Sequence, residues 1–133
     1  EIAPNKASML TLVMALSVAE GIRQCISQPG CPELQIKWPN DVIINGKKVV
    51  GILTEMSSQI DYINHVTVGV GINVNMTDFP EEIAQTATSL RIECGHTVKR
   101  APLIAAVMER LEENYEAFLE TVHTPLASTT QGS

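Results

Sequence analysis

The sequence is poor in aromatic and in basic residues. Phe, Trp and Tyr make up 4% of its 133 residues, with a single Trp, and nine Lys plus Arg stand against fifteen Asp plus Glu. The net charge of −6 argues against non-specific nucleic-acid binding, which needs a basic surface. It leaves room for one local anion site. With 44% hydrophobic residues, the chain is predicted to be one globular domain with a real core.

Long apolar runs and metal-ligand spacings are also lacking. The most apolar stretch, residues 9–22, is interrupted by Ser17, Glu20 and Gly21, and it falls short of the roughly 18 residues that a membrane helix needs. Three cysteines occur, an odd number, without a CxxC or HxxxH pattern. This usage favours reduced thiols in a cytoplasmic protein over a disulfide framework or a zinc site.

A strong helical periodicity lies near the start of the chain. It predicts a helix over about residues 7–28, packed against a sheet and ended by Pro29, Gly30 and Pro32. The apolar residues of this helix form a broad face: Leu10, Val13, Met14, Leu16, Ile22 and Ile26.

A β-hairpin is predicted next. Residues 34–37, LQIK, read as a short strand before a turn, and residues 41–44, DVII, meet the return strand 47–57 through Asn45 and Gly46. Asn-Gly between β-prone runs is typical of a type I′ turn, because both positions need positive φ.

A second hairpin is permitted by the polar residues 59–64, which lead into a strand over about residues 63–75. Its residues alternate between branched apolar and small or polar types, so one face is expected in the core and the other outside it. The core face comprises Val66, Val68, Val70, Ile72 and Val74, and the other face comprises His65, Thr67, Gly69, Gly71 and Asn73.

Helices are expected again in the last third. Pro80 with Glu81 and Glu82 is typical of the first turn of a short helix, whereas ATSLRIECG fits no single element. Pro102 opens a final helix to about residue 121. The whole order predicts an α+β (mixed α/β) fold, with a mainly antiparallel sheet of hairpins packed by helices on one face. The final helix has apolar residues at helical spacing: Leu103, Ile104, Val107, Met108, Leu111, Tyr115, Phe118 and Leu119.

A cluster of positive charge surrounds the first hairpin of this acidic chain. Three of its nine cations, Lys37, Lys47 and Lys48, lie there. Lys47 is interpreted as an ordinary solvated turn residue. Lys48 precedes the apolar run VVGILTEM, so it is either solvated as well or partly buried, and a buried ammonium needs an anionic partner.

Several residues beside these lysines allow two interpretations each. Asn40 and Asp41 are common turn formers, but Asp41 near two lysines could instead hold Mg²⁺ or a ribose hydroxyl. Trp38 either fills space in the core or forms a wall on which a ligand stacks. Gly69 and Gly71 leave a bare strip of backbone that admits either a ligand or a neighbouring helix or ring. The GVG sequence is not a GxGxxG fingerprint, so a Rossmann site is not indicated.

Three blocks in order, KWPND, KKVVGILTE and GVGINVN, resemble the catalytic domain of biotin–protein ligases (biotin–[acetyl-CoA-carboxylase] ligases). ATSL and LEENYEAFL look like the same domain further along. The resemblance implies a class II aminoacyl-tRNA synthetase/biotin synthetase-like fold, incomplete at the N-terminus. It also implies an enzyme that joins biotin to ATP, with Mg²⁺, as biotinyl-5′-AMP. The biotinyl group then passes to one lysine of a biotin carboxyl carrier domain of a carboxylase.

The resemblance also implies roles for single residues. Lys48 matches the catalytic lysine that contacts the biotin carboxylate and the α-phosphate, where it stabilises developing charge. Lys37, Asn40 and Asp41 match the turn on the nucleotide and metal side, with Asp41 as the candidate Mg²⁺ ligand. The other positions implied to line the ligand are Trp38, Gly51, Leu53, Gly69, Gly71 and Asn73.

One expectation about geometry follows from these roles. Strict alternation along the return strand would place Lys48 and Gly51 on opposite faces. If both face the ligand, a bulge or strong twist must intervene, and Gly51 is the expected place for it.

Parts of the family pattern have no counterpart here: the GRGRxGRxW-type loop, the C-terminal β-barrel and the N-terminal helix-turn-helix. We therefore expect residues 1–125 to be the C-terminal part of the catalytic domain, followed by a polar tail at 126–133, with little or no activity alone. Partners are expected to be biotin, ATP and the carrier domain, without nucleic acid or membrane. A homodimer remains open.

Three other readings compete with the biotin ligase. The first is a lipoate–protein ligase or octanoyltransferase of the same fold. The second is a non-catalytic regulatory module that binds biotinyl-AMP and represses transcription, for which this chain offers no DNA-binding segment. The third is a plain dimerisation scaffold.

Overall fold

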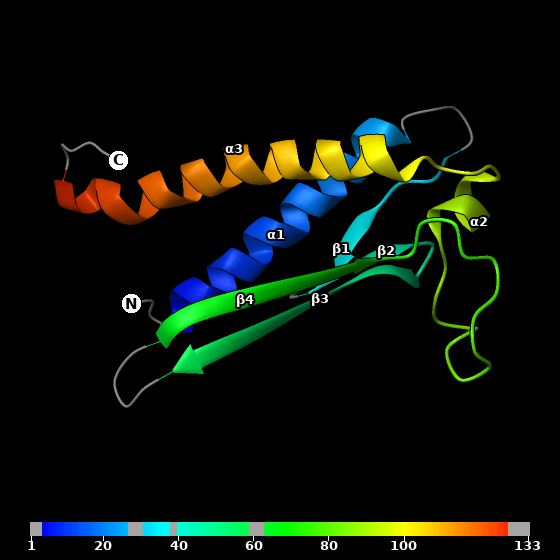
Figure 1. Ribbon diagram of the computed structural model, residues 1–133, viewed down its shortest axis with the longest axis horizontal. Helices are drawn as coiled ribbons and strands as arrows, with labels where there is room; N and C mark the ends of the chain where they lie inside the picture. The colour runs from blue at the N-terminus through cyan, green and yellow to red at the C-terminus, as the bar shows by residue number, and fades with distance from the viewer. Residues whose placement is uncertain (1–3, 27–30, 38–39, 59–62, 128–133) are drawn as a thin grey trace.

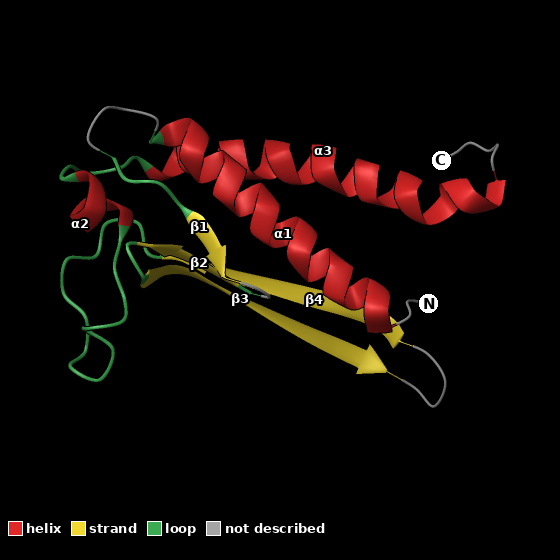
Figure 2. Ribbon diagram, turned by 180° about the vertical axis from the view of Figure 1, so that it is seen from behind, coloured by secondary structure: helices red, strands yellow, loops and turns green. Residues whose placement is uncertain are grey.

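A computed structural model describes residues 4–26, 31–37, 40–58 and 63–127. It contains one antiparallel sheet in the order β1-β2-β3-β4, with α1 packed on one face of the sheet and α3 packed along α1 (Figures 1 and 2). The α+β prediction is therefore confirmed. The elements are α1 (Pro4–Cys25), β1 (Gln35–Lys37), β2 (Asp41–Ile44), β3 (Lys47–Ser58), β4 (Ile63–Ile72), α2 (Leu90–Cys94) and α3 (Arg100–Ala127).

Helix α1 is buried on two sides, because it lies between the sheet and α3. It begins and ends about three residues earlier than predicted, and Leu16, expected in the core, is 38% exposed. The crossing with α3 is close at Gly21, where an added Cβ would lie 2.7 Å from the backbone of Val107. Small residues therefore occupy much of the buried surface, which comprises Val13, Ala15, Ser17, Val18, Ala19 and Ile22. The predicted terminators Pro29 and Gly30 lie outside the described residues.

The first hairpin has the predicted turn. Asn45 and Gly46 have φ of 53° and 80°, and β2 pairs with β3 on either side of them. The β3 strand also contains the expected bulge, but earlier than Gly51. Val42 pairs with Val50 and the next residue along β2 pairs with Lys48, so that Val49 is the extra residue.

Strand β4 is shorter than predicted and only partly covered. It ends at Ile72, and the turn Gln59–Asn64 falls largely outside the described residues, as do the side chains of His65 and Val66. Val74 is buried and Val68 and Ile72 pack against the core, but Val70 is 37% exposed. The expectation of a fully buried face was wrong for Val70, because β4 is an edge strand.

The last third differs most from the prediction. Residues 81–86 form turns rather than a helix, and the short helix α2 lies ten residues later, with Ser89 as its N-cap. Helix α3 buries Leu103 and Val107, but Ile104, Met108 and Tyr115 are 57%, 56% and 43% exposed. Among the described elements, α1 is the main packing partner of α3. In the described part of the chain, no helix is both long and apolar enough to cross a membrane.

Candidate functional site

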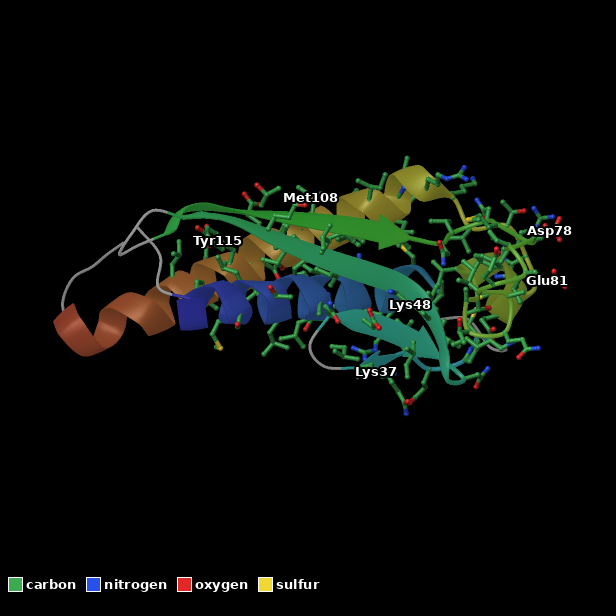
Figure 3. All side chains as sticks on the ribbon, turned by 90° about the horizontal axis from the view of Figure 1, so that it is seen from below. Lys37, Lys48, Asp78, Glu81, Met108 and Tyr115 are labelled. Atoms are coloured by element: carbon green, nitrogen blue, oxygen red, sulfur yellow. The ribbon has the colours of Figure 1, made fainter. Side chains whose placement is uncertain are left out.

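The outer face of the sheet, opposite α1, carries a row of cross-strand neighbours. In this row Lys37 pairs with Asp41, Asp41 with Gly51, and Gly51 with Gly71. Figure 3 looks onto this face, with Lys37 and Lys48 labelled on it. Because the positions on β3 and β4 are glycines, that end of the row is bare main chain, which a ligand can approach closely.

Lys48 lies directly over this bare strip. Its Nζ is 3.4 Å from Asp41 Oδ1, and a Cβ added to Gly51 would lie 2.9 Å from Lys48 Cε and 3.1 Å from Nζ. The Lys48 side chain is 52% exposed, whereas that of Asp41 is 25% exposed. Of the two sequence interpretations of Lys48, the second required an anionic partner; that partner is present, and the lysine side chain is about half exposed.

The bulge brings Lys48 and Gly51 to the same face. Val49 and Val50 are both fully buried, so two consecutive residues point inward and their neighbours on either side point outward. Beyond Gly51 the alternation resumes, with Ile52 buried and Leu53 63% exposed. The conflict raised by strict alternation is thus resolved by the packing of two valines.

The main chain of Lys48 is held by a second segment. Its N–H donates to the Thr86 carbonyl at 2.8 Å, and its carbonyl accepts from the Thr88 N–H at 2.9 Å, which forms a parallel bridge with Ala87. This segment pairs with β3 beyond the point at which β4 ends. The cation therefore projects from a main chain that is paired on both sides, with β2 and with residues 86–88.

Asn73 anchors the same junction. Its N–H donates to the Val49 carbonyl at 2.9 Å, its carbonyl accepts from Leu90 N–H, and its Nδ2 donates to the Thr88 carbonyl at 3.1 Å. The family resemblance implies that Asn73 lines the ligand. In the structure the Nδ2 donor of this residue is engaged with the segment that holds Lys48.

These residues surround a hollow of about 390 Å³ at the end of the sheet. The sequence interpretation missed four of its residues, Ile72, Ile83, Thr86 and Ala87. The ATSL block is part of the family resemblance, but nothing in the pattern of residues 80–86 indicates that their turns reach Lys48. The lining comprises Lys48, Gly51, Gly71, Ile72, Asn73, Ile83, Thr86 and Ala87.

The other candidate residues lie on or beside the same face. Gly69 pairs with Leu53, one row further from the hollow. Asn40 is exposed, and its carbonyl accepts from Ile52 N–H at 3.0 Å. Trp38 lies outside the described residues. Where side chains are described, no cluster of three His, Cys, Asp or Glu residues could hold a metal ion.

Several known proteins are similar in sequence to this chain. Bifunctional ligase/repressor BirA of Bacillus subtilis is 40% identical over 124 residues, which are 92% of this chain and 37% of that protein. Biotin–[acetyl-CoA-carboxylase] ligase of Mycobacterium tuberculosis is 41% identical over 81 residues, 61% of this chain and 27% of that one. The chain thus spans between about 27% and 39% of the length of the curated relatives it matches.

Solved structures give the same result. Biotin protein ligase from Aquifex aeolicus in complex with biotin and ATP has a TM-score of 0.72 and 38% identity, over 85% of this chain and 45% of that one. Its apo structure has a TM-score of 0.74, 37% identity and coverage of 88% and 49%. The class II aminoacyl-tRNA synthetase/biotin synthetase-like fold expected from the sequence is confirmed by this likeness. The sequence model of the biotin/lipoate A/B protein ligase family matches residues 1–73, and this chain belongs to that family.

Proposed function

We propose that this chain is part of the catalytic domain of a biotin–protein ligase, which forms biotinyl-5′-AMP from biotin and ATP and transfers biotin to a lysine of a biotin carboxyl carrier domain. Family membership and the likeness to a ligase bound to biotin and ATP support the proposal. The observation that carries it is the Lys48 ammonium, placed over the bare backbone of Gly51 and beside Asp41.

In the first step, a carboxylate oxygen of biotin attacks the α-phosphorus of ATP. An O–P bond forms, the bond between the α-phosphorus and the bridging oxygen breaks, and pyrophosphate leaves with that oxygen. Two anions must approach each other, and a fixed cation between them lowers the cost of that approach. We assign this role to Lys48, because its ammonium lies over the glycine floor formed by Gly51 and Gly71 and its side chain is about half exposed.

In the second step, the amine of the acceptor lysine attacks the acyl carbon of biotinyl-5′-AMP. A C–N bond forms, the C–O bond to the phosphate breaks, AMP leaves, and the amine loses a proton. Lys48 again faces the phosphate that carries the leaving charge. The Gly51–Gly71 floor contributes by lacking side chains, because any Cβ there would occupy the space of the ligand.

The remaining candidates are assigned to the ligand walls. Lys37, Asn40 and Asp41 belong to the nucleotide side, with Trp38 nearby in the sequence, whereas Leu53 and Gly69 belong to the far end of the floor. Ile83, which is 44% exposed and lines the hollow, offers an apolar wall beside the cation.

Mg²⁺ is proposed to enter with the phosphates of ATP. Asp41 supplies one carboxylate, and Mg²⁺ commonly takes one or two carboxylates plus substrate phosphates, so the residues fit this limited role. When bound, the ion would neutralise charge on the pyrophosphate leaving group. Asp41 would then serve two cations, because Lys48 already lies 3.4 Å from its Oδ1.

The wider assignments also remain proposals. We propose residues 1–125 as the C-terminal part of the catalytic domain and 126–133 as a polar tail, in a cytoplasmic protein that can form a homodimer. A lipoate or octanoyl ligase is the main alternative, because the matching family includes both branches. Isothermal titration with biotin and with lipoate separates them: binding of lipoate alone would reverse the choice.

The direct test is biotin-dependent ATP–pyrophosphate exchange in the longest natural polypeptide that contains these residues. Lys48→Ala should lower the rate by about 10²–10³, the usual loss when one preorganised stabiliser is removed. The matched control is Lys47→Ala, an exposed neighbour at the hairpin, which should retain most of the activity. Equal losses would mean that local charge matters rather than one positioned ammonium, and full activity of Lys48→Ala would favour a binding or scaffold role.

A further inference from the structure

Glu93, on α2, joins the two segments that lie on either side of Lys48. Its Oε1 accepts a hydrogen bond from Asn45 Nδ2 at 2.9 Å, and its Oε2 accepts one from Thr88 Oγ1 at 2.6 Å. Asn45 lies at the tip of the β2–β3 hairpin, whereas Thr88 belongs to the segment paired with Lys48. One carboxylate therefore links both supports of the lysine.

The connection through Thr88 is short and protected from water. Thr88 is 1% exposed, and its contact with Glu93 has the length of a charge-assisted O–H···O⁻ hydrogen bond. The Thr88 N–H donates in turn to the Lys48 carbonyl at 2.9 Å. Two hydrogen bonds in series thus lead from the Glu93 carboxylate to the peptide of Lys48.

The connection through Asn45 acts on the other end of the same short stretch. Asn45 has a positive φ of 53°, and only two residues separate it from Lys48. By holding this tip residue, Glu93 restricts rocking of the hairpin, which would tilt the start of β3. Its two contacts therefore limit different motions of Lys48.

Helix α2 is a firm support for these contacts. Ser89 Oγ accepts from Ile92 N–H at 3.1 Å and donates to the Met76 carbonyl at 2.5 Å, which caps the helix and ties it to the preceding loop. The N–H groups of Leu90 and Arg91 donate to the carbonyls of Asn73 and Val74, just beyond β4. These bonds hold Glu93 in a fixed position relative to β4, the strand that supplies Gly71 to the glycine floor.

We propose that Glu93 is a positioning residue that sets the height and direction of Lys48 over the glycine floor, acting through Thr88 and Asn45. Lys48 has one ion pair and a side chain that is 52% exposed. The position and direction of its ammonium group therefore depend on where its main chain is held. The catalytic consequence of this placement rests on the proposed ligase function. The positioning itself does not.

Two measurements on the longest natural polypeptide containing this chain test the proposal. In Glu93→Ala, amide hydrogen exchange should accelerate by about tenfold or more at Lys48 and Thr88, because local opening becomes easier. It should change little at Ile52, whose N–H is bonded to Asn40 instead. The matched control is Glu109→Ala, an exposed glutamate of α3, which should leave all three amides unchanged.

Kinetics supply the second readout. Glu93→Ala should lower kcat for biotin-dependent ATP–pyrophosphate exchange by about tenfold, with the KM for biotin within about threefold, since a misplaced cation affects the reacting geometry. In a Lys48→Ala background it should cause no further loss, because residues that act as one unit are not additive. Glu93→Gln, which keeps one acceptor oxygen and the shape, should recover part of the rate.

The outcomes separate the two hypotheses. Unchanged exchange at Lys48 and Thr88 in Glu93→Ala would overturn the positioning role, and so would a loss that multiplies with that of Lys48→Ala. If Lys48→Ala were fully active, the ligase mechanism would fail, and hydrogen exchange would still decide the role of Glu93. If Glu93→Ala does not fold, the same comparisons are made with Glu93→Gln, in which accelerated exchange supports the proposal and unchanged exchange refutes it.

Discussion

A methyl group at Gly51 should disable the site without unfolding the protein. Gly51 has no positive φ, so alanine fits its backbone, but the new Cβ would lie 2.9 Å from Lys48 Cε. Carbon atoms prefer separations of about 3.5–4.0 Å, so the lysine chain must move outward by about 0.6–1.1 Å. The obstructing atoms are at the end of a flexible side chain, which makes this movement inexpensive for the fold.

The magnitudes favour a loss of activity over a loss of stability. A surface ion pair such as Lys48–Asp41 contributes about 0–1 kcal/mol, and replacing a strand glycine by alanine returns about 0.5–1 kcal/mol. The two effects nearly cancel, so the melting temperature should stay within about 4 °C. A displacement of about 1 Å at a reacting group can cost about 10²-fold, so kcat should fall by about 10- to 100-fold.

Biotin-dependent ATP–pyrophosphate exchange measures the loss of activity, and thermal unfolding of the same preparations measures the change in stability. Gly69→Ala is the matched control for stability, since it also adds one methyl group to a strand glycine and its Cβ would meet only the Leu53 carbonyl at 3.8 Å. Gly71→Ala is informative in another way: nothing lies within 4 Å of its Cβ, which enters the hollow, so it should raise the KM for biotin more than it lowers kcat. Wild-type kcat in Gly51→Ala would refute the reasoning, because Lys48 cannot keep its place beside that methyl group.

Three further predictions concern other parts of the molecule. Gly21→Ala should destabilise the fold by about 1–3 kcal/mol in urea unfolding, because its Cβ would meet the main chain of Val107, which cannot move aside easily. Burial and the neighbouring Cys31 thiol raise the pKa of Cys94 from its ordinary 9.0 to about 12. The thiol form is therefore favoured by folding, stability should be lost as pH rises from about 9 to 12, and Cys94→Ser should flatten that loss. Finally, the isolated 133-residue chain should show no robust ATP–pyrophosphate exchange, and sustained turnover would make a GRGRxGRxW-type loop dispensable.

Local signals predicted the first hairpin well and the distant contacts poorly. Asn45 and Gly46 determine their turn by their own backbone preferences, so these two residues are enough to predict it from the sequence. The turns that carry Ile83 next to Lys48 depend on pairing between residues 86–88 and β3, which no periodicity records. The exposure of Ile104, Met108 and Tyr115 was missed for a related reason, since helical spacing shows where a stripe lies but not whether anything covers it.

The bulge shows where sequence reasoning stops and why. Requiring Lys48 and Gly51 on one face correctly demands an irregularity between them, but the tolerance of glycine for unusual backbone predicts the wrong position for it, Gly51. The structure places the extra residue at Val49, where the core can accept two consecutive valines. Hydrophobic burial at Val49 and Val50, rather than backbone freedom at Gly51, therefore turns the lysine outward. Gly51 contributes something different: it lets the lysine chain lie across the sheet to reach Asp41.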